Sequence, residues 1–539
     1  MKTNQDTIAT GQFKPSDKRG WTQKMASLYD FDLSAFKPNG HILFLLALSL
    51  VYVTPIILSD RYHIDDLGRS ISGFTAWELV GRPLSNWILL LLNFQLPWSS
   101  ANLPGQGLVD TGYLFQLLSA LVLILVGYMY LLKLYDGRVD FFKTLTVFPL
   151  IASPFAIENF AYRFDSISMS LSIFCAMTAA LHCKNRILDM CGGAALLACG
   201  LCLYQSSFNV FIAATTLLVF KELVSDRSGT KKLILHNIVK CGAAIALYLG
   251  VVLRWYPPKG GYADEHSELL SISVDSLDVV AQNLHRYYEI IFTDLGDFKL
   301  LYFGFAACIA MAFFDAVSRR HTLRQKVLIV FALMACIGSL TLSNVGILIF
   351  LKSPVFQARA LIGYSIFLIF LMMCAEMSRK RLSVFAQTLL LIMTYKSLFV
   401  VYTYGAAARA QTIFDIQLAT QIRSGLEASQ FNPRQTLIIS GIQPLSPTTQ
   451  NSRKVHVIDY LVQRHIDNNW YWGYVFLYQQ GLRFTPPAPQ LNVNAIIREA
   501  CSASPVHSAQ SFNIYKYENS YVAAFEEGGC KSSYYKRSH

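Results

Sequence analysis

The feature that most constrains this chain is a series of apolar blocks, each close to the length that crosses a membrane as a helix. A helix needs roughly 20 residues to span a hydrocarbon core. Charged residues make up only 15% of the chain, against about 25% in soluble domains. The blocks predict a polytopic α-helical membrane protein of about eleven transmembrane helices. They lie near residues 41–59, 113–132, 144–157, 166–182, 187–204, 208–224, 235–253, 300–318, 327–350, 360–378 and 383–404.

The basic residues indicate the orientation of these helices. The net charge of +12 would suggest a nucleic-acid partner in a soluble protein, but here Lys and Arg gather in alternate short connections, such as 319–326 and 379–381. That distribution is the positive-inside signal of a membrane protein. We therefore expect membrane lipid as the surroundings and no nucleic acid as a partner.

The polar segment at residues 1–40 is too long for a cleavable signal peptide, which would place its apolar region much nearer Met1. We expect a cytoplasmic N-terminal tail at 1–40 and a transmembrane domain at 41–404, with long periplasmic connections at 60–112 and 254–299. Eleven spans that begin in the cytoplasm place the C-terminus in the periplasm, outside a bacterial inner membrane.

Residues 405–539 have the composition of a soluble domain, and we expect a small periplasmic α/β or α+β unit there. The apolar runs 437–439 and 512–517 predict strands, and 455–461 predicts either a strand or the start of a helix. Nine of the eleven cysteines lie in or at the ends of the apolar blocks. The other two, Cys501 and Cys530, are expected to form a disulfide in an oxidising compartment, with two unpaired thiols as the alternative.

The segment 62–70 carries two adjacent carboxylates just beyond the first helix. Adjacent residues point about 100° apart on a helix, so only one of Asp65 and Asp66 can face a given site. An ionised Asp can take the proton of a sugar hydroxyl as that hydroxyl attacks, and the other Asp would cap a helix or pair with Arg69. The alternative is a solvated loop with helix-capping acids.

A second polar segment, 158–166, lies in a short outer connection between two apolar blocks. It holds Glu158, Tyr162, Arg163 and Asp165. Polar side chains so near lipid usually face a cavity or the protein interior, and carboxylates beside aromatic rings suit a sugar. The alternative for Asp165 is the N-cap of the helix that follows.

Two cations, Lys352 and Arg359, lie near the outer surface against the charge bias of the topology. Arg can hold phosphate oxygens with two parallel hydrogen bonds, and Lys serves as a point charge. They are candidates for binding a lipid phosphate, or else they contact ordinary headgroups.

Several common motifs are absent from the sequence, including a Walker loop, GxGxxG and HExxH. No cytoplasmic connection is long enough for a nucleotide-binding domain. A nucleotide-sugar donor is therefore not expected, and an activated lipid donor fits better.

The chain resembles the serotype-converting O-antigen glucosyltransferases, the Gtr family, within the GT-C class of polyprenyl-phosphate-sugar-dependent glycosyltransferases. The resemblance rests on segment 62–70, on 81–84 with its Arg82, and on 162–166 with Glu158 upstream. It covers the membrane portion by topology and only these short motifs by sequence. The resemblance implies a GT-C-like fold.

The resemblance also implies undecaprenyl phosphate glucose as the lipid donor, glucose or another hexose as the sugar moved, and the lipid-linked O-antigen repeat as the acceptor. It assigns the catalytic base to Asp65 or Asp66, with inversion in one displacement. Lys352 and Arg359 would stabilise the leaving phosphate, an assignment that rests on position and charge. Some members of the wider class use a divalent cation at the first-loop acids, and two adjacent Asp residues leave that choice open.

Three other functions compete with this one. A transporter of lipid-linked sugars would require charged residues within the spans, which are few here. An O-antigen polymerase would favour large outer loops rich in arginine. In a membrane-anchored scaffold, the C-terminal domain would carry the function.

Overall fold

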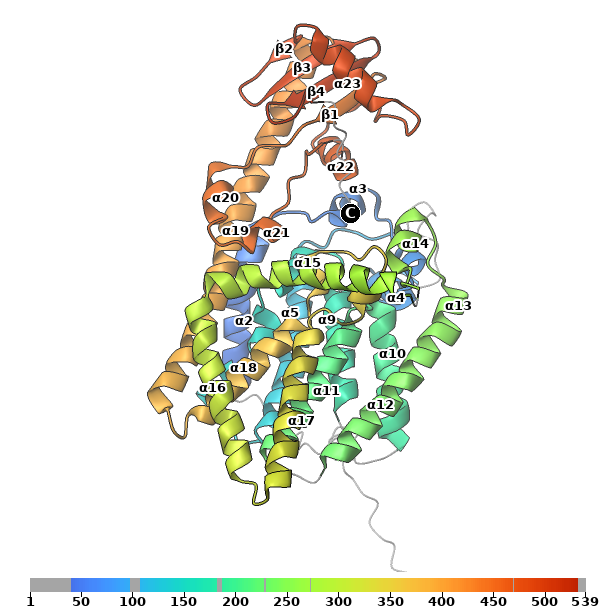
Figure 1. Cartoon of the computed structure of the whole chain (residues 1–539). Helices are drawn as coiled ribbons and strands as arrows, with labels where there is room; N and C mark the ends of the chain where they lie inside the picture. Colours follow the sequence, from blue (N-terminus) through green and yellow to red (C-terminus); the bar gives the residue numbers. More distant parts are fainter. Residues whose placement is uncertain are drawn as a thin grey trace, which may run out of the picture.

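The computed structural model describes residues 40–96, 107–181, 187–226, 229–271, 273–468 and 470–531, coloured in Figure 1. The expected cytoplasmic tail lies outside these residues, apart from its last position. The basic residues Lys184 and Arg186 of one short connection also lie outside them.

Apolar helices correspond to all eleven of the predicted spans, so the chain is a multi-pass membrane protein. In the described residues seven helices are long and apolar enough to cross a membrane. They are α2 (Gly40–Leu58), α5 (Leu114–Leu134), α11 (Ser207–Val224), α12 (Thr230–Leu247) continued by η4 (Tyr248–Val252) and α13 (Leu253–Trp255), α16 (Lys299–Ser318), α17 (Leu323–Leu342) and α19 (Ser383–Ala428).

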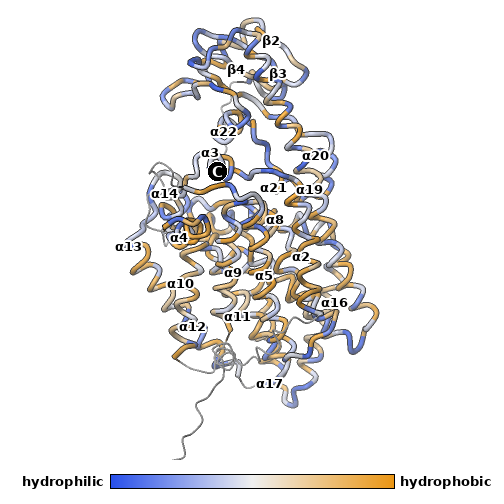
Figure 2. The backbone as a smooth tube through the Cα atoms, turned by 180° about the vertical axis from the view of Figure 1, so that it is seen from behind, coloured by the Kyte–Doolittle hydropathy of each residue, from blue (hydrophilic) through white to orange (hydrophobic). Residues whose placement is uncertain are grey.

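The other four predicted spans are shorter apolar helices, so the number that crosses the membrane stays a prediction. They are α6 (Phe141–Leu145) with α7 (Pro149–Ala152), α9 (Ser166–Ala180), η3 (Leu188–Gly192) with α10 (Gly193–Leu203), and α18 (Tyr364–Ser378). Figure 2 shows the hydrophobic residues concentrated in this bundle.

Short elements connect these helices, and several lie at the end of the bundle that faces the C-terminal sheet (Figure 1). They are α3 (Asp65–Ser72), η2 (Trp77–Val80), α4 (Pro83–Leu92), α8 (Ala156–Ala161), α14 (Gly261–Ser267), α15 (Asp275–Asp297), η5 (Gly346–Phe350) and η6 (Ala358–Ala360). Helix α4 begins at Pro83, a residue that suits the first position of a helix. Helix α15 lies across the ends of the long helices.

A buried ion pair fastens α15 to α19. The Lys396 ammonium is 2.5 Å from an oxygen of Asp294, and both side chains are almost fully buried. The hydroxyls of Tyr302 and Tyr364 donate to the other oxygen of Asp294 at 2.5 and 2.9 Å. A buried charge is retained only where it is paired and hydrogen-bonded, so this contact fixes how α15, α16, α18 and α19 meet.

Helix α19 does not end at residue 404, where the composition changes, but continues to Ala428. It contains no proline after residue 404, and residues 406–410 read AAARA, which favours helix. Its last turns bury Leu418, Ile422 and Leu426 in the core of the C-terminal domain. The boundary at 404/405 therefore marks a change of surroundings within one continuous helix.

The C-terminal domain holds a four-stranded mixed sheet in the order β1-β4-β3-β2. Strand β1 (Thr436–Ser440) pairs parallel with β4 (Ser520–Phe525), which pairs antiparallel with β3 (Phe512–Tyr517), and β3 with β2 (His507–Ser508). Thr436 lies opposite Ser520, and Phe512 opposite Phe525. The sheet therefore includes both predicted strands, at 437–439 and 512–517.

Four short helices complete this domain: α20 (Pro447–Ser452), α21 (Ile458–Leu461), α22 (Tyr471–Gln479) and α23 (Val493–Ser502). Segment 455–461 contains α21, so the strand alternative for it is wrong. Helix α23 packs on one face of the sheet, and α19 and α22 pack on the other. A disulfide joins Cys501 at the end of α23 to Cys530 after β4.

Candidate active site

Helix α3 begins at Asp65 directly after a strained turn. Ile64 precedes it with a φ of 31°, a conformation that β-branched residues rarely adopt. The two acids of the first helical turn then separate, since the Asp65 side chain is 36% exposed and Asp66 is fully buried. The 100° between adjacent helical positions gives them different surroundings.

Asp66 is held by backbone N–H groups. The Arg163 N–H donates to its carboxylate at 2.8 Å, and the N–H groups of Phe164 and His63 donate at 3.4 Å. Burial, together with the charge of Asp165, raises the pKa of Asp66 to about 7. This carboxylate ties the first connection to the α8–α9 connection, 97 residues away along the chain.

Arg69, one turn after Asp65, pairs with Asp165. A guanidinium nitrogen is 2.5 Å from an Asp165 oxygen, while the Trp77 indole N–H donates to the other oxygen. The guanidinium also lies over the Trp77 ring, 4.2 Å from its centroid, and 3.8 Å from Asp65. Asp165 lies at the N-cap position of α9, as the alternative predicted, but its side chain makes no cap bond there and serves this ion pair instead.

Glu158 connects the α8 segment to Arg359. Its buried carboxylate accepts the Arg359 backbone N–H at 2.7 Å and lies 3.3 Å from His63 Nε2. Burial alone would raise the pKa of Glu158, but the hydrogen bond and charge of His63, with Arg359, hold it below the usual value. The Tyr162 ring lies between His63, at 4.4 Å, and the Arg359 guanidinium, at 4.9 Å. Among the described residues the buried Tyr162 hydroxyl has no hydrogen-bond partner.

Arg82 and Arg359 both contact Tyr204. The Arg82 guanidinium lies 4.6 Å from the Tyr204 ring centroid, and its Nε donates to Gln205 at 2.6 Å. The Tyr204 hydroxyl donates to the Arg359 carbonyl at 3.2 Å. Neither guanidinium has a carboxylate within ion-pair distance in the described part of the chain.

We call Asp65, Arg69, Arg82, Asp165 and Arg359 the α3 cluster, because their charges act on one another. Besides burial, the charges of Arg69, Asp65 and Arg82 act on the pKa of Asp165. Burial, with repulsion from Arg82 and Arg69, lowers the pKa of Arg359 although Glu158 and Asp65 oppose the change. Bringing an anion to Arg82 and Arg359 would offset that repulsion.

Arg163 and Lys352, both predicted site residues, lie outside the α3 cluster and have partners of their own. Arg163 is sandwiched between the rings of Tyr62 and Tyr113, at 4.0 and 4.9 Å, and pairs with Asp60 and Asp110; we call these five residues the Arg163 cluster. Lys352 is 45% exposed, and its ammonium pairs with Glu268.

The first-loop acids do not fit a divalent-cation site. The oxygens of Asp66 already accept backbone N–H groups, and Asp65 lies 3.8 Å from the Arg69 guanidinium. In the described ranges no group of three or more His, Cys, Asp and Glu residues is arranged to hold a metal ion.

Sequence reasoning did not assign roles to His63, Trp77, Tyr204 and Gln205, which support the α3 cluster. His63 lies inside segment 62–70, and Gln205 is a polar residue in a short connection between two apolar blocks. The sequence therefore offered a reason to consider both as site residues. It offered none for Trp77 and Tyr204, because aromatic residues are common throughout this chain.

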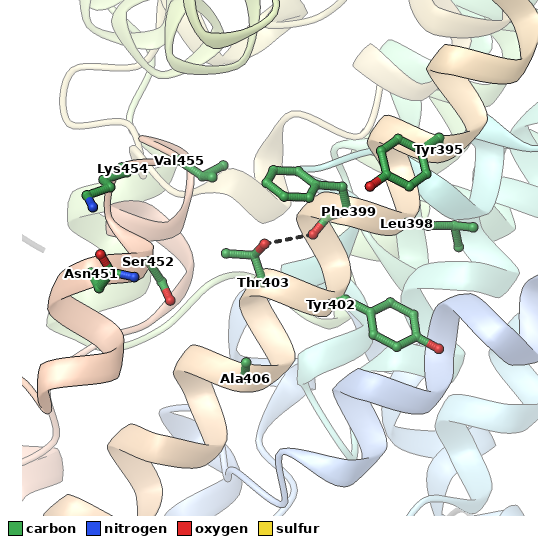
Figure 3. A pocket seen from close by; sticks show the side chains of 10 residues that line it. All are labelled: Tyr395, Leu398, Phe399, Tyr402, Thr403, Ala406, Asn451, Ser452, Lys454 and Val455. Carbon is green, nitrogen blue, oxygen red and sulfur yellow. Dashed lines mark hydrogen bonds between the residues drawn. The ribbon is translucent and has the colours of Figure 1, made fainter.

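A cavity of about 660 Å³ lies along the outer side of α19 and contains none of the α3 cluster. Figure 3 shows its side chains, with Tyr395, Phe399 and Tyr402 on α19 and Lys454 on the facing segment after α20. The α3 cluster is therefore defined by its ion pairs and not by this cavity.

Comparison with known proteins gives one family and two similar chains. The family model of glucosyl transferase GtrII matches residues 54–370. A protein of Salmonella phage P22, described as an uncharacterized 55.3 kDa protein in the gtrB 5' region, is 27% identical over 453 residues, which is 80% of this chain and 88% of that protein. The crystal structure of ArnT from Cupriavidus metallidurans bound to undecaprenyl phosphate is 14% identical, with a TM-score of 0.30 over 84% of this chain and 90% of ArnT. The segment matched by the family contains the whole α3 cluster.

Proposed function

The chain belongs to the glucosyl transferase GtrII family and is a membrane glycosyltransferase, and we propose that it moves glucose from undecaprenyl phosphate glucose to a hydroxyl of a lipid-linked O-antigen repeat. The observation that carries the proposal is the α3 cluster, in which one partly exposed carboxylate lies among three arginines. A transfer from a lipid phosphate needs a base and cations for the leaving group. Both are present in this cluster.

Asp65 is the base in this proposal. Its side chain is partly exposed, whereas the oxygens of Asp66 are occupied by backbone donors. Its carboxylate also lies 3.8 Å from the Arg69 guanidinium, which can orient it. Asp66 then has a structural role.

Arg82 and Arg359 are the phosphate-binding residues in this proposal, and Arg82 takes the place first considered for Lys352. The Arg82 guanidinium lies over the Tyr204 ring and that of Arg359 over the Tyr162 ring, and neither has a carboxylate partner among the described residues. Guanidinium groups bind phosphate oxygens in pairs of parallel hydrogen bonds. The ammonium of Lys352 is already paired with Glu268.

The reaction is a single displacement. As the acceptor hydroxyl oxygen attacks the anomeric carbon, its proton passes to Asp65. The bond from that carbon to the phosphate oxygen breaks, and its electron pair leaves with polyprenyl phosphate. Arg82 and Arg359 stabilise the charge that develops there. Attack opposite the leaving group inverts the anomeric configuration.

We further propose that the α3 cluster and the C-terminal domain lie in the periplasm and that the chain resides in a bacterial inner membrane. The alternation of basic connections supports this orientation. A lipid-linked acceptor on that face would reach the cluster without crossing the bilayer.

The test is the O-antigen structure of a host that expresses the wild-type chain or Asp65→Asn at matched membrane levels. The proposal expects a hexose branch with the wild type and none with the variant, by mass spectrometry and NMR. An unchanged repeat with altered chain length would support a polymerase instead. An unchanged repeat with altered export would support a lipid-linked sugar transporter.

A further inference from the structure

The C-terminal domain contacts the segment that carries Asp65 from two directions. The family match ends at residue 370, so it assigns nothing to this domain. Figure 1 shows α22 between the C-terminal sheet and α3, and α19 runs from the bundle into the same sheet. We propose that this domain is a positioning unit of the active site, which acts through Asp415 and Trp472; the proposal rests on the proposed role of Asp65.

The first contact is a buried polar hub around Asp415 on α19. Asp415 is completely buried, and Arg61 donates to it at 2.9 Å. Gln411, one helical turn earlier, and Gln443, after β1, donate to its other oxygen at 2.7 and 2.5 Å. His465 Nδ1 lies 3.5 Å away. A carboxylate buried with these partners can adopt few other arrangements.

The hub reaches the first connection through Arg61 and His465. The Arg61 guanidinium also donates to the Gln463 carbonyl, and the His465 ring is hydrogen-bonded to the Tyr62 backbone. Burial, with the charges of Arg61 and His63, lowers the pKa of His465 well below its usual value. Residues 61 and 62 are thereby fixed to a domain whose sequence begins more than 340 residues later.

The second contact is the packing of α22 on α3. Trp472 and Gln479 are seven residues apart and so share one face of α22. A Cβ added at Gly68 would lie 3.2 Å from Trp472, which measures how closely the two helices approach. Gln479 also donates to the Ser70 hydroxyl at 3.2 Å. Asp65 begins this same α3.

The two contacts enclose a strained turn. Ile64 lies between Arg61 on one side and α3 on the other, and its φ of 31° is a conformation that β-branched residues rarely adopt. Such a conformation persists only where the surroundings over-determine it. The bundle core supplies part of those surroundings and the C-terminal domain supplies the rest, so loosening that domain would let the turn relax and displace Asp65.

The experiment compares full-length Asp415→Asn and Trp472→Ala with the wild type in detergent. We expect amide hydrogen exchange to accelerate at least tenfold in residues 61–73 while helix α11 keeps its wild-type exchange. We also expect kcat for glucose transfer from undecaprenyl phosphate glucose to fall about tenfold to a hundredfold, since an error of about 1 Å at a reacting group can cost that much, with KM for this donor within twofold.

Tyr478→Ala is the matched control, because Tyr478 is another aromatic of α22, is 45% exposed and contacts Arg483. It should leave exchange and kcat at wild-type values. Gly68→Ala is a second variant that keeps the hub. Its Cβ would meet Phe74 at 2.9 Å and Trp472 of α22 at 3.2 Å, so it should lower kcat although alanine favours helix.

Wild-type exchange in residues 61–73 of both principal variants would overturn the proposal. Faster exchange along the whole chain would mean general destabilisation, which also counts against it. If the wild type transfers no glucose, the proposed function fails while the exchange comparison still decides the positioning role.

Discussion

Two neighbouring charged groups meet at the start of the first connection, and they differ in how completely their charges are paired. In the Arg163 cluster one arginine contacts two carboxylates and two tyrosine rings. In the α3 cluster Arg69 is paired with Asp165, but Arg82 and Arg359 are not paired among the described residues. Both groups lie close to the same short segments, 60–69 and 158–165.

The difference shows why a high local density of charge does not by itself identify a site. A charged side chain whose hydrogen-bonding groups are all paired inside the protein stabilises the fold and has few groups free to bind a substrate. A cation that contacts only aromatic rings and amide or carbonyl groups can still bind an anion. Chemistry is therefore expected in the α3 cluster, and stability in the Arg163 cluster and at Asp66.

The largest expected effect is at Asp65. Asp65→Asn removes the proposed base but keeps the size of the side chain, so kcat should fall about a thousandfold, within the usual range for a general base. The melting temperature in detergent should stay within about 2 °C, since Asp65 is partly exposed. Single-turnover kinetics with undecaprenyl phosphate glucose measure the rate. A loss below tenfold would assign the base elsewhere.

The next effect is at the two arginines. Arg82→Lys and Arg359→Lys keep the positive charge but lose the paired hydrogen bonds of a guanidinium. Each should lower kcat about tenfold to a hundredfold, and the double variant more than either. Arg163→Lys is the matched control, because Arg163 belongs to the other cluster. Equal losses of kcat at constant stability in all three variants would erase the distinction between the clusters.

Asp66→Asn should act mainly on stability. Replacing one carboxylate oxygen by an amide leaves a backbone N–H without its acceptor, which costs about 1–3 kcal/mol. The folded-state pKa of about 7 lies above the ordinary value for Asp, so the native state holds the proton longer than the unfolded chain. Wild-type stability should therefore fall as the pH rises from about 4 to about 7 and level off above that.

Thermal unfolding between pH 4 and pH 8 measures this effect. The wild-type melting temperature should decline across the window, and that of Asp66→Asn should decline less. The kcat of the folded variant should drop tenfold at most. A thousandfold loss at full stability would instead give Asp66 the role of the base.

The smallest effect is expected at Lys352, whose exposed ion pair with Glu268 contributes about 0–1 kcal/mol. Lys352→Ala should change kcat and KM for the lipid donor by less than twofold. A tenfold rise in KM would restore this residue as a phosphate ligand. Glu268→Gln, which breaks the same pair from the other side, separates loss of the pair from loss of the cation.

The sequence alone predicted the apolar helices, the two strands at 437–439 and 512–517, and the segments that meet in the α3 cluster. Those features follow from hydropathy and from short polar runs beside apolar blocks. The choice between Asp65 and Asp66 did not follow, because it depends on the partners that each carboxylate meets. The backbone donors of Asp66 come from residues 163 and 164.

The sequence also did not predict the partner of Lys352 or the end of α19, because both depend on contacts and packing in the folded chain. The sequence predicts a position for Lys352 near the outer surface, but it does not reveal its partner, Glu268, which lies 84 residues earlier. The composition changes at residue 404, yet helix formation depends on local propensity and packing, so α19 continues for two dozen residues into the C-terminal core.

The length of α19 has a consequence for exchanging parts between relatives. A helix of 46 residues measures about 69 Å, more than twice the thickness of a hydrocarbon core. Each residue added or removed within it rotates everything beyond by about 100° and shifts it by about 1.5 Å. A chimera that joins the membrane portion of one relative to the sheet of another must therefore keep the number of residues in this helix. An insertion of seven residues would nearly restore the rotation, yet it would lift the sheet about 10 Å above α3.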